Sequence, residues 1–162
     1  MTLEEICAYL DQNRVAYTHT VHPIAYTARE VAAAEHLPPR EVAKTVVIAA
    51  DSGYQMLVLP ANMLVDFQEL RIALGFTHAR MATETELSQL FPECELGAMP
   101  PFGNLCDMHV FADSALTRDE KIAFNACTHR DVIHMSFADY KRLVKPTILP
   151  LAREAAMHQQ AW

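Results

Sequence analysis

The spacing of hydrophobic residues changes several times along the chain, and each change predicts a new element. Between Leu3 and Leu10, apolar residues recur at every third or fourth position, which is typical of an amphipathic helix. An alanine-rich stretch from Thr27 to His36, stopped by two consecutive prolines, predicts a second helix. A third helix is predicted over 66–74, because Gly75 directly follows it and suits a helix end.

Two more helices and several strands complete the predicted order. The sequence Thr83-Glu84-Thr85-Glu86 is a capping box, so a helix is predicted from there to about Phe91, and another begins at Ser136. Short apolar runs bounded by turn residues predict strands at 15–20, 45–50, 55–60, 108–112, 122–126 and 131–135. Interleaved hairpins and helices indicate an α+β fold with a mixed sheet, rather than a doubly wound parallel one.

The length of 162 residues fits one domain, which we expect to span 1–145. After Pro146 and Pro150, residues 146–162 are expected to form a C-terminal extension containing a short helix. No apolar run reaches the roughly 18 residues of a membrane span, and the first residues lack the basic and apolar regions of a secretory signal. We therefore expect a cytoplasmic protein without a membrane partner.

The charge and the cysteines exclude some classes of function. A net charge of −7 argues against broad electrostatic capture of DNA or other nucleic acid. The basic stretch from Lys141 to Lys145 fits a solvated helix face, although a local binding patch is an alternative. The four cysteines form no C-x-x-C pair and are expected to be reduced, and Cys94, Cys106 and Cys127 do not have the spacing of zinc ligands. No metal and no cofactor is expected.

Candidate chemistry concentrates in one loop and one lysine. Two of the four glycines lie in the segment from Gly97 to Gly103, which also contains two prolines, so this loop is stiff and its amides can point outward. Lys44 stands where the chain enters an apolar strand. Together they can hold a carbonyl, a carboxylate or a phosphate. The alternatives are a plain connection and a lysine whose stem is buried while its ammonium reaches water.

Other catalytic signatures are missing. The chain has no G-x-S-x-G elbow, no G-x-x-x-x-G-K-[ST] loop and no G-x-G-x-x-G fingerprint. His129 lies at a predicted turn between two strands, where a structural role is the alternative to a functional one.

In combination, these segments resemble the YbaK/prolyl-tRNA synthetase-associated editing domain family. The resemblance rests on Val42-Ala43-Lys44-Thr45-Val46-Val47, on the loop Gly97-Ala98-Met99-Pro100-Pro101-Phe102-Gly103, and on Asn125-Ala126-Cys127-Thr128-His129 with Met135, Ser136 and Asp139 after it. It runs from about Val15 to Val144. The chain departs from the family at Cys127, where Gly is more frequent, and at Thr45, where some branches have Asn.

The resemblance implies a fold and an activity. The fold would be a single α+β domain with a central mixed, partly barrel-like sheet flanked by helices. The activity would be hydrolysis of the ester that joins a wrong, small amino acid to the 3′ end of a tRNA, with an aminoacyl-tRNA synthetase as a further possible partner. The alternative is a non-catalytic aminoacyl- or protein-binding module of the same fold.

The resemblance also implies roles for particular residues. The amides of Gly97 and Ala98, in a loop shaped by Pro101 and Gly103, would stabilise the oxyanion. Lys44 would hold the carbonyl oxygen or a terminal phosphate, and not act as a base, since the sequence shows nothing that lowers its pKa. His129 would orient these groups. Ala28 and Val31 would line a small apolar pocket, and such a pocket separates substrates only about 10–200-fold for each methylene.

Overall fold

The centre of the molecule is the hairpin formed by β2 (Ala43–Ala50) and β3 (Gly53–Pro60), in a computed structural model that describes residues 1–155. The hairpin lies in a five-stranded sheet with the order β5-β2-β3-β6-β9, which includes β5 (Ala79–Met81), β6 (Val110–Asp113) and β9 (Thr147–Leu149). β3 and β9 run parallel to β6, and the other pairs are antiparallel. The predicted mixed sheet is therefore confirmed.

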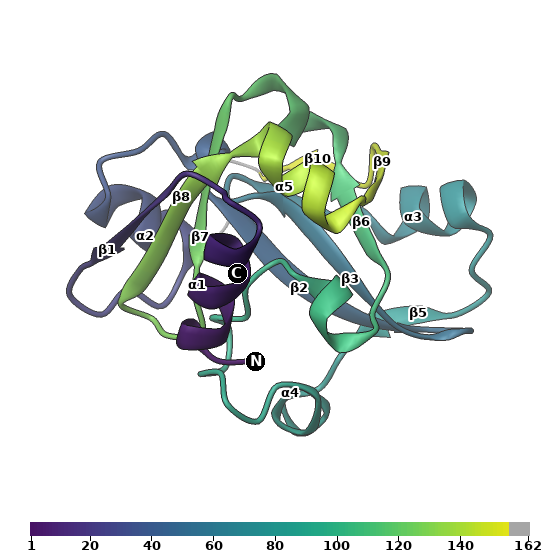
Figure 1. The fold of residues 1–162 in the computed structure, drawn as a ribbon. Helices are drawn as coiled ribbons and strands as arrows, with labels where there is room; N and C mark the ends of the chain where they lie inside the picture. Colours follow the sequence, from purple (N-terminus) through teal and green to yellow (C-terminus); the bar gives the residue numbers. More distant parts are fainter. Residues whose placement is uncertain (156–162) are drawn as a thin grey trace.

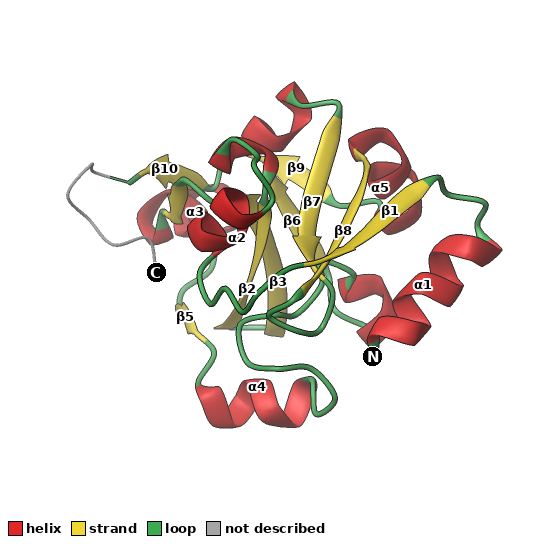
Figure 2. Ribbon diagram, turned by 90° about the vertical axis from the view of Figure 1, so that its left-hand side faces the viewer, coloured by secondary structure: helices red, strands yellow, loops and turns green. Residues whose placement is uncertain are grey.

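A second sheet lies against this one and combines the first strand with two strands from the later part of the chain. β1 (Tyr17–Val21), β8 (Asp131–Ser136) and β7 (Lys121–Asn125) are antiparallel, with β8 in the middle. An isolated parallel bridge between Val42 and Ala123 links the two sheets at the start of β2. Figures 1 and 2 show the two sheets packed face to face. The strands within residues 1–155 stay in separate sheets and form no closed barrel.

Within residues 1–155, five α-helices surround the sheets. They are α1 (Leu3–Gln12), α2 (Ala28–Ala34), α3 (Phe67–Leu74), α4 (Glu84–Leu90) and α5 (Phe137–Val144). The side chain of the residue before each helix accepts a backbone hydrogen bond from its first turn. Thr83 forms the predicted capping box with Glu86, and Gly75 ends α3 with a φ of 69°.

Both faces of the central hairpin are buried. Residues such as Val47 and Met56 point into the main core, which also contains side chains of α1, α5, β7 and β8. Their neighbours Ile48 and Leu57 point to the opposite face, where Leu70 of α3 covers them. This explains why the two strands read as continuous apolar runs, and it makes β2 a rigid support for the residues that it carries.

The segment after Pro146 differs from its prediction. Residues 147–149 form β9 against β6, and β10 (Ala152–Glu154) pairs with β4 (Met63–Val65). Asp113 stabilises this arrangement, because its buried carboxylate accepts hydrogen bonds from the backbone N–H groups of Leu151 and Ala152 at 2.9 and 3.0 Å. The expected short helix is therefore wrong for residues 147–154, and its remaining part lies outside the described residues.

Candidate active site

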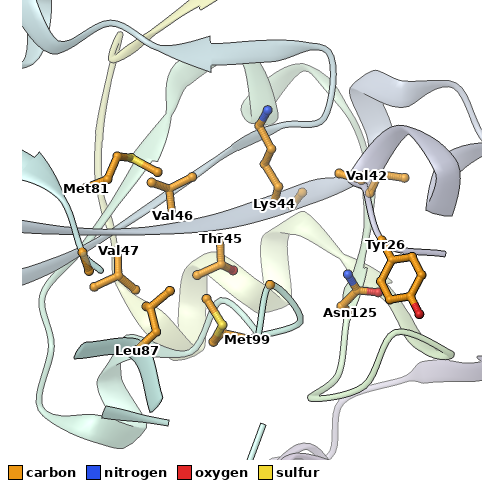
Figure 3. Close-up of a pocket in the computed structure, with 14 residues that line it drawn as sticks. Tyr26, Val42, Lys44, Thr45, Val46, Val47, Met81, Leu87, Met99 and Asn125 are labelled. Carbon is orange, nitrogen blue, oxygen red and sulfur yellow. The ribbon is translucent and has the colours of Figure 1, made fainter. Parts of the chain in front are cut away.

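A small cavity opens beside the first half of β2. β3 pairs with β2 along its whole length, whereas β5 reaches only residues 48–50, so 43–47 have no strand of residues 1–155 on their other side except the single bridge at Val42. A cavity of about 200 Å³ occupies this position (Figure 3). It is lined by Tyr26, Ala28, Val42, Ala43, Lys44, Thr45, Val46, Val47, Met81, Ala82, Leu87, Gly97, Met99 and Asn125.

Lys44 is a buried lysine in the wall of this cavity. This residue is only 8% exposed. Burial, and secondly the neighbouring charge of Arg29, lower the pKa of Lys44 from 10.5 to about 8. Nothing in the sequence indicates this shift. Lys44 extends from β2 on the same side as Val46 and Met81, while Thr45 and Val47 point the opposite way (Figure 3). Lys44 also borders an adjoining cavity together with Arg153.

The glycine-proline loop contributes Gly97 and Met99 to the cavity. Gly97 has a φ of 86°, a conformation that glycine adopts without strain. The N–H groups of Gly97 and Met99 donate no hydrogen bond to another described residue. The N–H of Ala98, in contrast, donates to the carbonyl of Glu95 at 3.0 Å, and Ala98 is completely buried. The amides left for a ligand are therefore those of Gly97 and Met99, and Ala98 is not among them.

Pro101 and Gly103 support the loop from behind the cavity. The carbonyl of Pro101 accepts a hydrogen bond from the buried hydroxyl of Tyr140 at 2.7 Å. A Cβ atom at Gly103 would lie 2.7 Å from the carbonyl oxygen of Met108, so only glycine fits there. Neither residue lines the cavity.

His129 connects the loop to the turn after β7. Its backbone N–H donates to Glu95 Oε1 at 2.8 Å, and its Nε2 lies 2.7 Å from the carbonyl oxygen of Leu96. Since a carbonyl can only accept, Nε2 carries the hydrogen. The ring of Tyr26 packs against the His129 ring with 5.1 Å between centroids. His129 therefore positions the loop that bears Gly97, and it does not itself line the cavity.

Cys127 holds the same two segments together. Its N–H donates to the carbonyl of Ala98, and its own carbonyl accepts from the N–H of Glu95, each at 2.9 Å. Cys127 adopts a φ of 72°, which accounts for the glycine that the resembled family more often has there. The sulfur atoms of Cys94 and Cys127 lie against each other, whereas Cys7 and Cys106 are free.

Of the two residues predicted to line the pocket, only one does so in the structure. Ala28 lines the cavity, but Val31 lies on the buried side of α2 and is fully covered by core residues. The sequence interpretation did not find Tyr26, Thr45, Met99 and Asn125 as lining residues. Asn125 begins one of the segments that carry the family resemblance, and Thr45 lies in another directly after Lys44, so their places within those motifs were the available signal.

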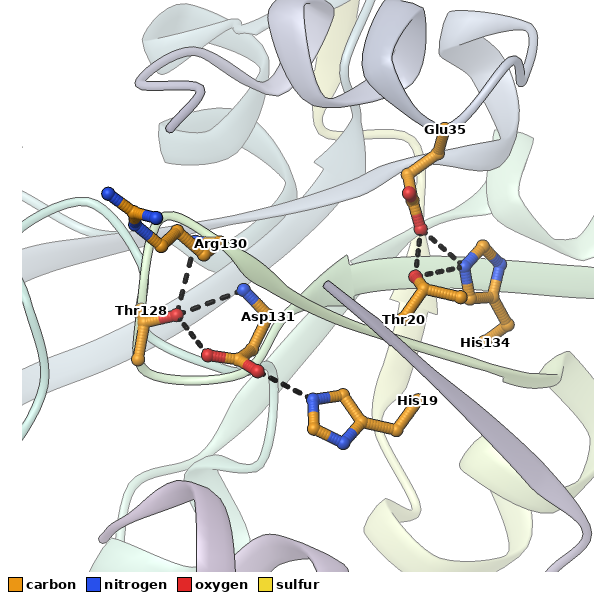
Figure 4. A network of polar contacts seen from close by, with 7 residues as sticks. All are labelled: His19, Thr20, Glu35, Thr128, Arg130, Asp131 and His134. Atoms are coloured by element: carbon orange, nitrogen blue, oxygen red, sulfur yellow. Dashed lines mark hydrogen bonds and ion pairs between the residues drawn. The ribbon is translucent and has the colours of Figure 1, made fainter. Parts of the chain in front are cut away.

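A polar network fixes α2, and with it Ala28, to the second sheet (Figure 4). The carboxylate of Glu35, which caps the end of α2, lies 2.7 Å from Nε2 of His134 and accepts a hydrogen bond from the hydroxyl of Thr20. Burial acts to raise the pKa of Glu35, but these two contacts outweigh it and the pKa is lowered. Nearby, His19 Nε2 lies 2.6 Å from Asp131 Oδ1.

The buried lysine and the glycine loop, which lie at one edge of the sheet, fall within the part of the chain that matches a family of editing domains. A family model for the aminoacyl-tRNA editing domain matches residues 22–143, and the chain belongs to this family. The multifunctional Ser/Thr-tRNA deacylase ProXp-y of Escherichia coli strain K12 is 31% identical over 101 residues. That match covers 62% of this chain and 60% of the length of the relative.

Solved structures share the fold of this chain. A candidate trans-editing enzyme for prolyl tRNA synthetase superposes with a TM-score of 0.81 at 17% identity, over 93% of this chain and 96% of the other. The hypothetical protein APE2540 gives a TM-score of 0.82 at 15% identity, over 91% and 99% of the two chains. None of the helices within residues 1–155 has the length and apolar character that a bilayer span requires.

Proposed function

We propose that this protein hydrolyses the ester bond between a small amino acid and the 3′ end of a mischarged tRNA. The observation that carries the proposal is that Lys44 and two amides with no protein acceptor within residues 1–155, those of Gly97 and Met99, border one cavity of about 200 Å³. Membership of the aminoacyl-tRNA editing family and the similarity to a Ser/Thr-tRNA deacylase support it.

The amides and the lysine would act on different parts of the substrate. Fixed N–H groups stabilise the negative charge that develops on the carbonyl oxygen of an ester, and the amides of Gly97 and Met99 would do so here. Lys44 shares its surroundings with Arg29 and Arg153, so this side of β2 is cationic in a protein whose net charge is −7. We assign Lys44 to the terminal phosphate of the tRNA.

Water activation would not depend on a side-chain base. The cavity-lining residues include no His, Cys, Asp or Glu, and Lys44 with a pKa of about 8 is about nine-tenths protonated at pH 7. The ester is already activated, so the ribose hydroxyl of the substrate or a backbone carbonyl would orient the attacking water. Neither a covalent enzyme intermediate nor a metal takes part.

We expect full activity in the presence of a chelator. Within residues 1–155, no three His, Cys, Asp or Glu side chains are grouped to hold a metal ion. Deacylation should therefore proceed at the same rate after dialysis against EDTA. A loss of activity that zinc restores would contradict the metal-free mechanism.

The size of the cavity would favour small aminoacyl groups such as seryl and threonyl. Ala28→Leu adds bulk to the wall and should lower kcat/KM more for threonyl- than for seryl-tRNA, by about tenfold or more. Val31→Ala is the matched control, because Val31 belongs to the core. It should lower thermal stability and leave the seryl-to-threonyl ratio unchanged. Equal effects of the two variants on this ratio would show that Ala28 does not bound the aminoacyl site.

A panel of mischarged tRNAs tests the function directly. We expect release of small amino acids from their tRNAs and no comparable release from correctly charged tRNAs with large side chains. Binding of aminoacyl-tRNA without release would instead support the non-catalytic module. Equal activity on free amino-acid esters would indicate a general esterase. The net negative charge is consistent with a synthetase supplying additional affinity for the tRNA, which an added synthetase would reveal as a lower KM.

A further inference from the structure

Two cysteines lie next to each other where the glycine-proline loop meets the turn after β7. Cys94 precedes the loop by three residues, Cys127 lies in the turn, and their Cα atoms are 4.3 Å apart. A disulfide can join two cysteines without backbone movement when their Cα atoms are less than about 7 Å apart. The backbone holds the two segments in this position, because the carbonyl of Cys127 accepts a hydrogen bond from the N–H of Glu95 at 2.9 Å. The pair is therefore placed to exchange two thiols for one disulfide.

The backbone conformation of Cys127 points to a role for its side chain. Its φ of 72° lies in the left-handed region, where every side chain is disfavoured relative to glycine. The turn alone would be formed with less strain by glycine. Residues that keep a side chain in such a conformation are concentrated at functional positions. The side chain that Cys127 brings there meets the sulfur atom of Cys94.

The surroundings suit the dithiol as well as the disulfide. As thiols, Cys94 and Cys127 donate hydrogen bonds to the carbonyl oxygen of Met1 at 3.4 and 3.3 Å. Thiols are weak donors, so little is lost when a covalent bond replaces these two contacts. Cys94 is half-buried, whereas Cys127 is only 3% exposed. An oxidant from solution therefore reaches Cys94 first, and Cys127 is the second thiol to react.

The pair lies at the start of the loop that carries the free amides of the cavity. Hydrogen bonds of Cys127 and His129 tie this loop and the residues before it to the turn. Such contacts open and close locally, and each opening displaces the amides of Gly97 and Met99. A covalent bond at Cys94 would remove the conformations in which the loop leaves the turn.

We propose that Cys94 and Cys127 form a reversible redox latch on the glycine-proline loop. The oxidant is a small disulfide such as oxidised glutathione. The thiolate of Cys94 attacks one of its sulfur atoms, forms a mixed disulfide and releases one glutathione. The thiolate of Cys127 then attacks the Cys94 sulfur and releases the second. The protein loses two electrons and two protons, which convert the oxidant into two glutathione thiols, and excess dithiothreitol reverses the reaction. This inference goes beyond the proposed hydrolysis and does not depend on it.

The test compares the full chain in dithiothreitol with the same chain in oxidised glutathione. Peptide mass spectrometry should find Cys94 joined to Cys127 only after oxidation. The thermal denaturation midpoint should rise by about 5 °C or more with the cross-link. Hydrogen exchange at the amides of Gly97 and Met99 should slow at least about tenfold, because the loop opens less often.

Variants of single cysteines assign these effects. Cys94→Ser should lose the cross-link and the dependence of both measurements on oxidant. Cys127→Gly should do the same, and it suits the φ at this position, so it serves if a serine variant fails to fold. Cys106→Ser is the matched control, because Cys106 is also half-buried but free. It should keep the cross-link and the full shift of the denaturation midpoint.

The contradicting outcomes are distinct from those that bear on the deacylase function. The latch is refuted if oxidised glutathione never joins Cys94 to Cys127. It is also refuted if the cross-link forms but leaves both the denaturation midpoint and the exchange of the loop unchanged. None of these measurements needs a substrate. A protein that hydrolyses no aminoacyl-tRNA would therefore refute the proposed function and leave the latch standing, and a failed latch would leave the proposed function standing.

Discussion

Lys44→Met is expected to lower kcat/KM for deacylation by about 10²–10³-fold without lowering the thermal denaturation midpoint. The first effect follows because an ionic contact that positions the reacting ester is lost. The second follows because Lys44 is a buried cation whose charged form is disfavoured, so an apolar side chain of similar length suits the site. Steady-state kinetics and calorimetry of the same samples measure both.

Lys141→Met is the control for this variant, because Lys141 is an exposed residue of α5 that does not line the cavity. It should match the wild type in rate. If Lys44→Met also deacylates as fast as the wild type, Lys44 has only a structural role at the start of β2. The cavity is then not the active site.

The pKa of Lys44 adds a dependence on pH. Catalysis that relies on its ammonium should decline as the pH rises through about 8, relative to spontaneous ester hydrolysis, and Lys44→Met should lack this inflection. Stability changes in the opposite direction. The folded pKa of about 8 lies below the value of 10.5 in the unfolded chain, so the unfolded state binds more protons between these pH values. The contribution of Lys44 to the free energy of unfolding therefore rises across that window.

Gly97→Ala is expected to reduce kcat/KM by about 100-fold, beyond its effect on stability. The φ of 86° at Gly97 disfavours any side chain, so the variant must rotate the amides of the loop or carry strain. A Cβ atom there would lie 3.5 Å from Cε1 of His129, which is an ordinary contact. The expected defect thus comes from the backbone conformation and not from a clash.

Gly75→Ala isolates that backbone effect. Gly75 ends α3 with a φ of 69°, and a Cβ atom added there would meet no atom within 4 Å, so the substitution carries similar strain away from the cavity. Both variants should lose about 1 kcal/mol of stability in urea unfolding. Only Gly97→Ala should lose activity. A proportional loss of activity in both would mean that the loop at Gly97 has no special part in the reaction.

Local signals in the sequence predicted most of the elements but not the long-range pairings. Thr83 and Gly75 mark helix ends through contacts within four residues, so their consequences can be read from the chain. β10 pairs with β4, which lies far earlier in the chain, and its three residues carry no alternating pattern of their own. The expectation of a helix there relied on alanine content, which tertiary pairing outweighed.

Part of the candidate site was predictable from residue types that stand out in the sequence. Gly97 and Lys44 stand out in the sequence and do border the same cavity. Which face of α2 borders the cavity was not predictable, because the two faces of an alanine-rich helix look alike. Val31 belongs to the core. The Cys94–Cys127 pair, 33 residues apart, has no spacing signature. Asn125 could not be singled out from the sequence, because only a structure shows which buried side-chain amides lack a hydrogen-bond partner.

The most direct measurement is single-turnover deacylation of a tRNA mischarged with serine, with enzyme in excess. It compares the wild type with a Lys44→Met, Gly97→Ala double variant. The wild type should release serine far faster than spontaneous hydrolysis, and the folded double variant should release it at nearly the spontaneous rate. A wild type no faster than spontaneous hydrolysis, or a double variant as fast as the wild type, would contradict a deacylase site at the edge of β2.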